Sequence, residues 1–124
     1  MTDYTKLYDE AIKASEKSYS PYSDFRVGSA LLTSDGKIFT GCNIENASYS
    51  LTVCAERTAI FKAVSEGISD FEAIAIYGTE NPCIPCGACL QVMSEFCESD
   101  FKVVLSDGVH ELKEFMPNAF RLKK

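Results

Sequence analysis

The sequence Pro82-Cys83-Ile84-Pro85-Cys86-Gly87-Ala88-Cys89 places three cysteines at intervals of three residues, directly before an apolar-periodic segment. If Pro85 opens a helix, Cys86 and Cys89 lie at positions i and i+3 and present both thiols on one face. A further cysteine lies upstream in Val53-Cys54-Ala55-Glu56-Arg57, at the start of a second predicted helix. We interpret the two segments as the two halves of a zinc site with a carboxylate beside it.

A catalytic zinc ion keeps three protein ligands and an open fourth position, whereas a structural zinc ion has four. The three ligands predicted here are Cys54, Cys86 and Cys89. Cys83 is a candidate fourth ligand that would close the site, but Pro85 separates it from the predicted helix, so we expect it outside the ligand set. An iron–sulfur centre fits the start of the spacing, but Met93 and Ser94 stand where that pattern needs cysteine and proline.

Glu56 and Arg57 follow the first zinc cysteine directly. Glu56 is about 200° around the predicted helix from Cys54, where it coordinates the same ion poorly. A carboxylate outside the coordination shell is suited to general acid–base catalysis, and the apolar neighbours of Glu56 argue against a merely solvated side chain. Arg57 lies one turn after Cys54 and can donate to the thiolates, whose combined charge exceeds that of Zn²⁺. The alternative for Arg57 is a surface ion pair.

Length and charge limit the other possibilities. A chain of 124 residues is expected to form a single domain over 1–124, and a net charge of −6 disfavours binding to nucleic acid. The stretch 1–6 has no features of a leader, and no apolar run is long enough for a membrane span. We therefore expect a cytoplasmic protein, in which the six cysteines serve as ligands or core residues rather than disulfides.

The remaining pattern predicts an α/β fold. Its order, α-β-β-α-β-α-β, is typical of a three-layer α-β-α arrangement with a mixed, roughly five-stranded sheet. A short strand and a turn of helix are expected in the last residues, around Phe115 and Phe120. The polar stretch 43–50 has no period and is predicted to be a loop. The predicted helices cover 3–18, 52–66 (with Thr52 as N-cap) and 85–97, and the predicted strands cover 26–33, 37–42, 71–77 and 101–105.

Cys54-Ala55-Glu56 together with Pro85-Cys86-Gly87-Ala88-Cys89 resembles the signature of zinc nucleoside and nucleobase deaminases. Over nearly its whole length the chain resembles the small homotetrameric cytidine deaminases, and Asn43-Ile44-Glu45-Asn46-Ala47 narrows the resemblance to enzymes of free nucleosides. The other segments that fit this family are Pro21-Tyr22-Ser23, Phe25-Arg26-Val27-Gly28, Gly41 to Tyr49 and Cys54 to Ala59.

The resemblance implies hydrolytic deamination of cytidine and deoxycytidine to uridine and deoxyuridine in pyrimidine salvage. It implies one Zn²⁺ per chain that activates water, with Glu56 as the proton shuttle. It further implies a homotetramer with its sites at subunit interfaces, and neither a nucleic-acid nor a membrane partner. Two alternatives remain: a related deaminase of the blasticidin S type, and a non-catalytic structural zinc module with four ligands.

The resemblance also assigns roles in substrate binding. Asn43 and Glu45 would bind ribose hydroxyls, Phe25 would lie near the pyrimidine, and Ala47 and Tyr49 would reach a neighbouring subunit's site. The alternatives are ordinary ones: a core ring for Phe25 and turn-capping roles for Asn43 and Glu45.

Three further residues complete these expectations. Phe120 resembles the family's C-terminal aromatic residue that closes a neighbour's pocket, and its alternative is simply to fill an interface. Leu90 departs from the family, which usually has arginine there, and this leaves Arg57 and the helix ends to offset the thiolate charge. His110 is the only histidine, and we expect it to have a surface role.

Overall fold

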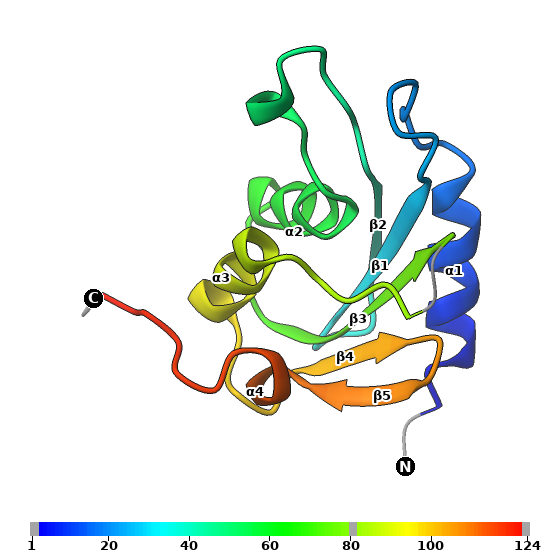
Figure 1. The fold of residues 1–124 in the computed structure, drawn as a ribbon. Coiled ribbons are helices and arrows are strands. Elements are labelled where there is room, and N and C mark those ends of the chain that lie inside the picture. Colours follow the sequence, from blue (N-terminus) through cyan, green and yellow to red (C-terminus); the bar gives the residue numbers. More distant parts are fainter. Residues whose placement is uncertain (1–2, 80–81, 123–124) are drawn as a thin grey trace.

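The structure of the protein is a computed structural model that describes residues 3–79 and 82–122. Figure 1 shows the path of the chain. In chain order the elements are α1 (Thr5–Ser15), β1 (Val27–Thr33), β2 (Ile38–Cys42), the 3-10 helix η1 (Tyr49–Leu51), α2 (Ala55–Ser65), β3 (Phe71–Gly78), α3 (Gly87–Phe96), β4 (Lys102–Leu105), β5 (Gly108–Glu111) and α4 (Leu112–Phe115).

The strands form one mixed sheet in the order β2-β1-β3-β4-β5. The pairs β1–β2, β1–β3 and β4–β5 are antiparallel, whereas β3 and β4 are parallel. Parallel neighbours need a crossover connection, and α3 provides it. The prediction of a mixed sheet of about five strands is confirmed.

Helices cover both faces of the sheet, with α1 on one face and α2 and α3 on the other (Figure 1). Alternation along β3 separates the two cores, because Ile74 and Ile76 pack toward α2 and α3 while Ala73 and Ala75 pack toward α1. The small residues let α1 lie close to the sheet. At Gly28 a Cβ atom would lie 2.0 Å from the carbonyl oxygen of Ala11, so only glycine fits beneath α1.

Two helix starts differ from the prediction, and both shifts concern the zinc motif. The N-cap of α2 is Cys54 rather than Thr52, because Thr52 ends η1 and donates its N–H to the carbonyl oxygen of Tyr49 (3.1 Å). The predicted start of α3 at Pro85 is also wrong, since Cys86 is the N-cap. Both cysteines therefore have extended backbones at the point where a helix begins.

The two ends of the chain are less helical than predicted. The first helix covers Thr5–Ser15 instead of 3–18, and α4 ends at Phe115, so Phe120 lies outside a helix. Residues 123–124, which belong to the expected C-terminal segment, lie outside the described residues. Among the residues that are described, no helix is long and apolar enough to cross a membrane.

Candidate metal centre

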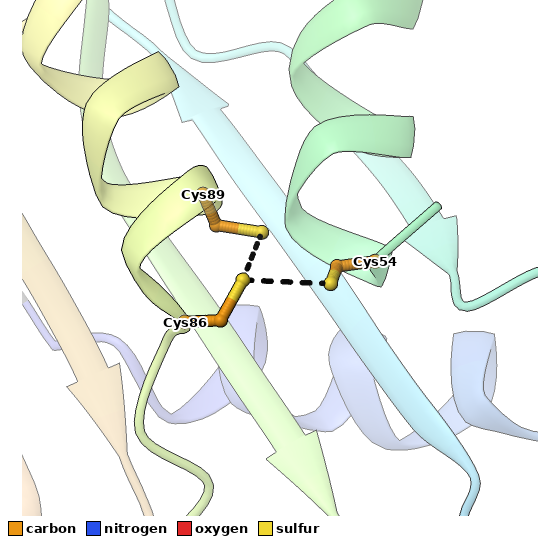
Figure 2. A group of neighbouring side chains, drawn as sticks. All are labelled: Cys54, Cys86 and Cys89. Carbon is orange, nitrogen blue, oxygen red and sulfur yellow. Dashed lines mark hydrogen bonds between the residues drawn. The ribbon is translucent and has the colours of Figure 1, made fainter. Parts of the chain in front are cut away.

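Three thiols from two helix starts converge at one point (Figure 2). Cys54 precedes α2, Cys86 precedes α3, and Cys89 lies in the first turn of α3. The Sγ atoms of Cys54 and Cys86 are 3.7 Å apart, and those of Cys86 and Cys89 are 3.5 Å apart. All three sulfur atoms lie within 4.8 Å of one another, so the predicted ligand residues come together.

The spacing of these sulfur atoms fits a tetrahedral zinc ion. With Zn–S bonds of about 2.3 Å, a tetrahedron has S–S edges of about 3.8 Å, close to the two measured separations. Thiolate ligands also favour zinc, because few other biological metals prefer them. Within residues 3–79 and 82–122, Cys83 does not belong to this group, and the group contains no histidine or carboxylate. The three cysteines therefore form a three-ligand set.

The surrounding charge favours thiolates. Cys54 and Cys86 are the N-caps of α2 and α3, at the positive ends of the two helix dipoles, where backbone N–H groups have no partners within the helix. Arg57 Nη2 donates to Cys54 Sγ at 3.6 Å. The pKa of Cys54 is lowered to about 5, mainly because the Cys89 thiol donates to it and also because Arg57 does, against the opposing effect of burial. The pKa of Cys89, the donor in that pair, is raised.

Glu56 is enclosed beside the thiols. Its side chain is only 4% exposed and lies in the first turn of α2. Burial and, to a smaller extent, the charge on Cys54 raise its pKa to about 7, against the opposing effects of a backbone hydrogen bond and a hydrogen bond with the Cys89 thiol. A carboxyl group that exchanges its proton near neutral pH is suited to acid–base catalysis.

Leu90 is buried among the apolar residues between the sheet and α3, with 7% of its surface exposed. The position at which the family usually has arginine is therefore used for core packing here. The buried Nε of Arg57 has no hydrogen-bond partner among the described residues. Arg57 thus directs Nη2 toward the Cys54 sulfur atom, while its Nε has no partner in the part of the chain that the structure describes.

Asn43 is buried, and most of its amide is used within the chain. Its Oδ1 accepts from the N–H of Val27 (3.0 Å) and from the Ser18 hydroxyl, and its Nδ2 donates to the carbonyl oxygen of Phe25 (2.8 Å). An amide can make four such bonds, so one N–H of Nδ2 has no partner among the described residues. Asn43, which the sequence analysis assigns to ribose binding, therefore also fixes the backbone at Phe25 and at Val27, the first residue of β1.

Glu45 lines a cavity of about 320 Å³, together with Tyr22, Asn46 and Tyr49 among others. Its carboxylate accepts from the N–H of Tyr22 (2.9 Å), from the N–H of Ser23 (3.2 Å) and from the Ser23 hydroxyl. These bonds, led by the hydroxyl of Ser23, lower the pKa of Glu45. Nothing in the sequence singled out Ser23 as the residue that orients this carboxylate.

Among the other predicted contact residues, Phe25 is partly buried against the core, whereas Ala47, Tyr49 and Phe120 are exposed. Ala47 and Tyr49 lie on the loop between β2 and α2, which extends beyond the sheet in Figure 1, and Tyr49 is 79% exposed. Phe120 is 66% exposed on the C-terminal tail. His110 lies on β5, where its ring nitrogens contact Asp107 and Glu114, each at 2.7 Å, so its expected surface role is confirmed.

Comparison with known proteins agrees with this geometry. Residues 1–105 match the family described as the cytidine and deoxycytidylate deaminase zinc-binding region. The chain is 51% identical to a cytidine deaminase of Sporosarcina psychrophila, over 95% of this chain and 91% of that protein. It is 34% identical to the blasticidin-S deaminase of Bacillus cereus, over 77% of this chain and 76% of that protein.

Solved structures give the same result. A crystal structure of cytidine deaminase from Burkholderia pseudomallei superposes with a TM-score of 0.89 at 46% identity, and covers 96% of this chain and 100% of that one. The cytidine deaminase of Mycobacterium tuberculosis superposes with a TM-score of 0.91 at 36% identity, over 98% of this chain and 100% of that one. The three-layer fold predicted from the sequence is therefore confirmed.

Proposed function

The chain belongs to the family of zinc-binding cytidine and deoxycytidylate deaminases, and from this premise we propose that it hydrolyses cytidine and deoxycytidine to uridine and deoxyuridine, releasing ammonia. One observation supports this above the others: a buried carboxyl group, Glu56, lies against three convergent thiols that come from two helix starts. A structural zinc module gives no reason for burying an acid at that point.

Cys54, Cys86 and Cys89 would hold one zinc ion per chain. When bound, zinc lowers the pKa of water and so supplies the nucleophile. Metal binding requires the thiolate form of its cysteine ligands, and Arg57 favours that form at Cys54 by donating to its sulfur atom. In this proposal the three zinc ligands and the guanidinium group of Arg57 all belong to one chain.

Glu56 carries the protons. It accepts one from the attacking water and delivers it to N3 of the pyrimidine as oxygen adds to C4. It then takes the proton of the new C4 hydroxyl group and passes it to the exocyclic amine, which leaves as ammonia as the C4–N bond breaks and the C4=O bond forms. The raised pKa of Glu56 suits both directions of transfer, and exchange of this kind contributes about 10²–10⁴-fold in rate.

The nucleoside would lie between the thiols and the loop that follows β2. We assign the remaining N–H of Asn43 and the carboxylate of Glu45 to ribose hydroxyls, because both groups are held rigidly by neighbouring hydrogen bonds. The ring of Phe25 would lie against the pyrimidine. Ala47 and Tyr49, both exposed, would reach the site of a second copy.

Exposed apolar side chains support a homotetramer with sites at subunit interfaces. Tyr49, Leu51 and Phe120 are 79%, 62% and 66% exposed, and side chains of this kind are typical of surfaces that pair. Phe120 would then close the pocket of a neighbouring copy. A single catalytic domain over 1–124 that acts in cytoplasmic pyrimidine salvage is part of the same proposal.

The test is uridine formation from cytidine, followed by the change in ultraviolet absorbance, with and without a zinc chelator. We expect the chelator to abolish turnover and added zinc to restore it. Glu56→Gln should keep one zinc per chain and lose at least about 10³-fold in turnover. An active Gln variant would refute the role of Glu56. A matched panel with blasticidin S tests the related activity named by the 34% identical relative.

A further inference from the structure

Phe25 meets Gly78 and Cys83 at the end of β3. A Cβ atom placed on Gly78, the last residue of β3, would lie 2.7 Å from the Sγ of Cys83 and 3.0 Å from its Cβ. The same point is 3.1 Å from the Cζ atom of Phe25. The Cys83 side chain and the tip of the Phe25 ring therefore flank the bare backbone of Gly78, and no larger residue fits there without moving one of them.

Phe25 is already held by its backbone. Its N–H donates to the Ser23 hydroxyl (3.0 Å), and its carbonyl oxygen accepts from Asn43 Nδ2 (2.8 Å). With the backbone fixed, the direction of the ring depends on what its edge packs against. Gly78 and Cys83 are among the residues near that edge, because a Cβ atom on Gly78 would lie close to both Phe25 Cζ and Cys83 Sγ.

Cys83 has no part in the metal group, although it lies three residues before a ligand. Its side chain is half-buried and packs, like Phe25, against the core between the sheet, α2 and α3. A sulfur atom near the edge of an aromatic ring is a favourable contact, because sulfur is polarisable and the ring edge carries partial positive charge. The thiol therefore suits this position as a packing group.

We infer that Cys83 and Gly78 are positioning residues that hold the Phe25 ring in place for the pyrimidine. The inference rests on the proposed function, in which Phe25 contacts the base. Small displacements of groups that position a substrate have large effects on rate, since about 1 Å can cost about 10²-fold. Cys83 thus acts on the reaction through Phe25 and not through the metal.

A pair of substitutions tests this by mutual compensation. Gly78→Ala should raise KM for cytidine by about tenfold, because its methyl group displaces Cys83 or Phe25. Cys83→Ala should raise KM by about threefold, since the ring loses its support. In the double variant the new methyl group occupies space left by the sulfur atom, so KM should return to within about threefold of wild type. Zinc should stay at one per chain in all three.

Cys42→Ala is the matched control, because Cys42 is another half-buried thiol, on β2. It should leave KM unchanged. If Gly78→Ala and Cys83→Ala have additive effects on KM, or if Cys83→Ala lowers zinc content, the inference is wrong.

A second measurement does not depend on activity. The chain has no tryptophan, so Phe25→Trp introduces a single fluorescent probe at the ring position. In that background, Cys83→Ala should increase quenching by acrylamide about twofold, while Cys42→Ala should not. A probe that does not respond, in an enzyme whose wild type deaminates cytidine, overturns the inference alone. A responsive probe in a wild type without turnover would instead support the contact and refute the proposed function.

Discussion

The thiol cluster and the loop that follows β2 are built in opposite ways. Cys89 and Glu56 are 0% and 4% exposed and lie where two helices begin on the core side of the sheet. Tyr49 and Leu51, on the loop, are 79% and 62% exposed. The chemical half of the candidate site, here called the enclosed half, comes from one chain and is buried at Cys89 and Glu56, although Cys86 is exposed. The half proposed to contact the nucleoside, here called the open half, would be completed by a second copy.

The contrast has a cause in the packing. At Gly41, on β2, a Cβ atom would lie 2.5 Å from the carbonyl oxygen of Ala55 and 2.6 Å from the N–H nitrogen of Ala59. The backbone of α2 therefore rests directly on the sheet and fixes the start of that helix. The loop is held instead by hydrogen bonds, such as those of the bridge between Ile44 and Val53, and its side chains Tyr49 and Leu51 do not pack into the core. Removing a group from the enclosed half should therefore have larger effects than removing one from the open half.

The largest effect is expected from Cys89→Ser. A serine hydroxyl is a poor zinc ligand, and two thiols alone cannot fill the set, so zinc should fall well below one per chain and turnover by about 10³-fold or more. Metal analysis together with the cytidine assay measures both. Cys97→Ala is the control, because Cys97 is a buried thiol whose pKa burial raises to about 12. Full zinc in Cys89→Ser would show that the ligand set is wrong.

The enclosed half is also the part that could be predicted from the sequence. Ligand identity depends on residue type and short spacing, and Cys86 and Cys89 are close in the chain, so their convergence follows from one helix turn. The predicted helix starts were wrong by two residues or so, because local cap signals at Thr52 and Pro85 competed with tertiary contacts. This error does not affect the predicted ligands, because an N-cap residue and the residue three positions after it still lie on one face of the helix.

The contacts that orient the substrate residues were not predictable in this way. The Ser23 hydroxyl donates to Glu45, which lies 22 positions later in the sequence. Asn43 donates to the carbonyl oxygen of Phe25, which lies 18 positions earlier. The Gly78–Cys83 contact depends on where β3 ends relative to a loop. No periodicity encodes such pairings, because they arise only once the sheet order places distant segments together.

Arg57→Ala should have a smaller effect than loss of a ligand. Arg57 donates to Cys54 without binding metal in our proposal, and supporting groups of this kind typically contribute about 10–100-fold in metal affinity. Competition with a chromogenic chelator measures the change. Arg26→Ala is the control, since that exposed guanidinium donates to the carbonyl oxygen of Glu16 instead. Unchanged zinc affinity in Arg57→Ala would leave the helix starts as the main source of positive charge.

Tyr49→Ala tests the open half. The side chain is 79% exposed, so the free energy of unfolding of one chain should change by no more than about 0.5 kcal/mol. Activity should instead fall on dilution, with a matching shift to smaller species in sedimentation velocity. Val109→Ala, at a 54% exposed position on β5, should show neither change. A Tyr49 variant with wild-type activity at every concentration would mean that the loop needs no second copy.

The smallest effect belongs to His110, which lies in neither half. A hydrogen bond to Asp107 and, as the second cause in size, one to Glu114 raise the pKa of His110. Because the folded pKa is above the unfolded value of about 6.5, the stabilisation is complete below that pH and is lost as the pH rises through the folded pKa. His110→Gln should therefore lower the free energy of unfolding by less than about 1 kcal/mol at pH 5.5 to 6, and by less still at pH 9.

Urea unfolding of both proteins at the two pH values measures this difference, and cytidine turnover should be the same in both. A His110→Gln deficit that grows with pH would mean that the ring is held in its neutral form. A loss of turnover would mean that the edge of the sheet formed by β5 is coupled to the thiol cluster. Either result would weaken the view that the enclosed half is self-contained, because its chemistry would then depend on a surface ion pair in a separate part of the fold.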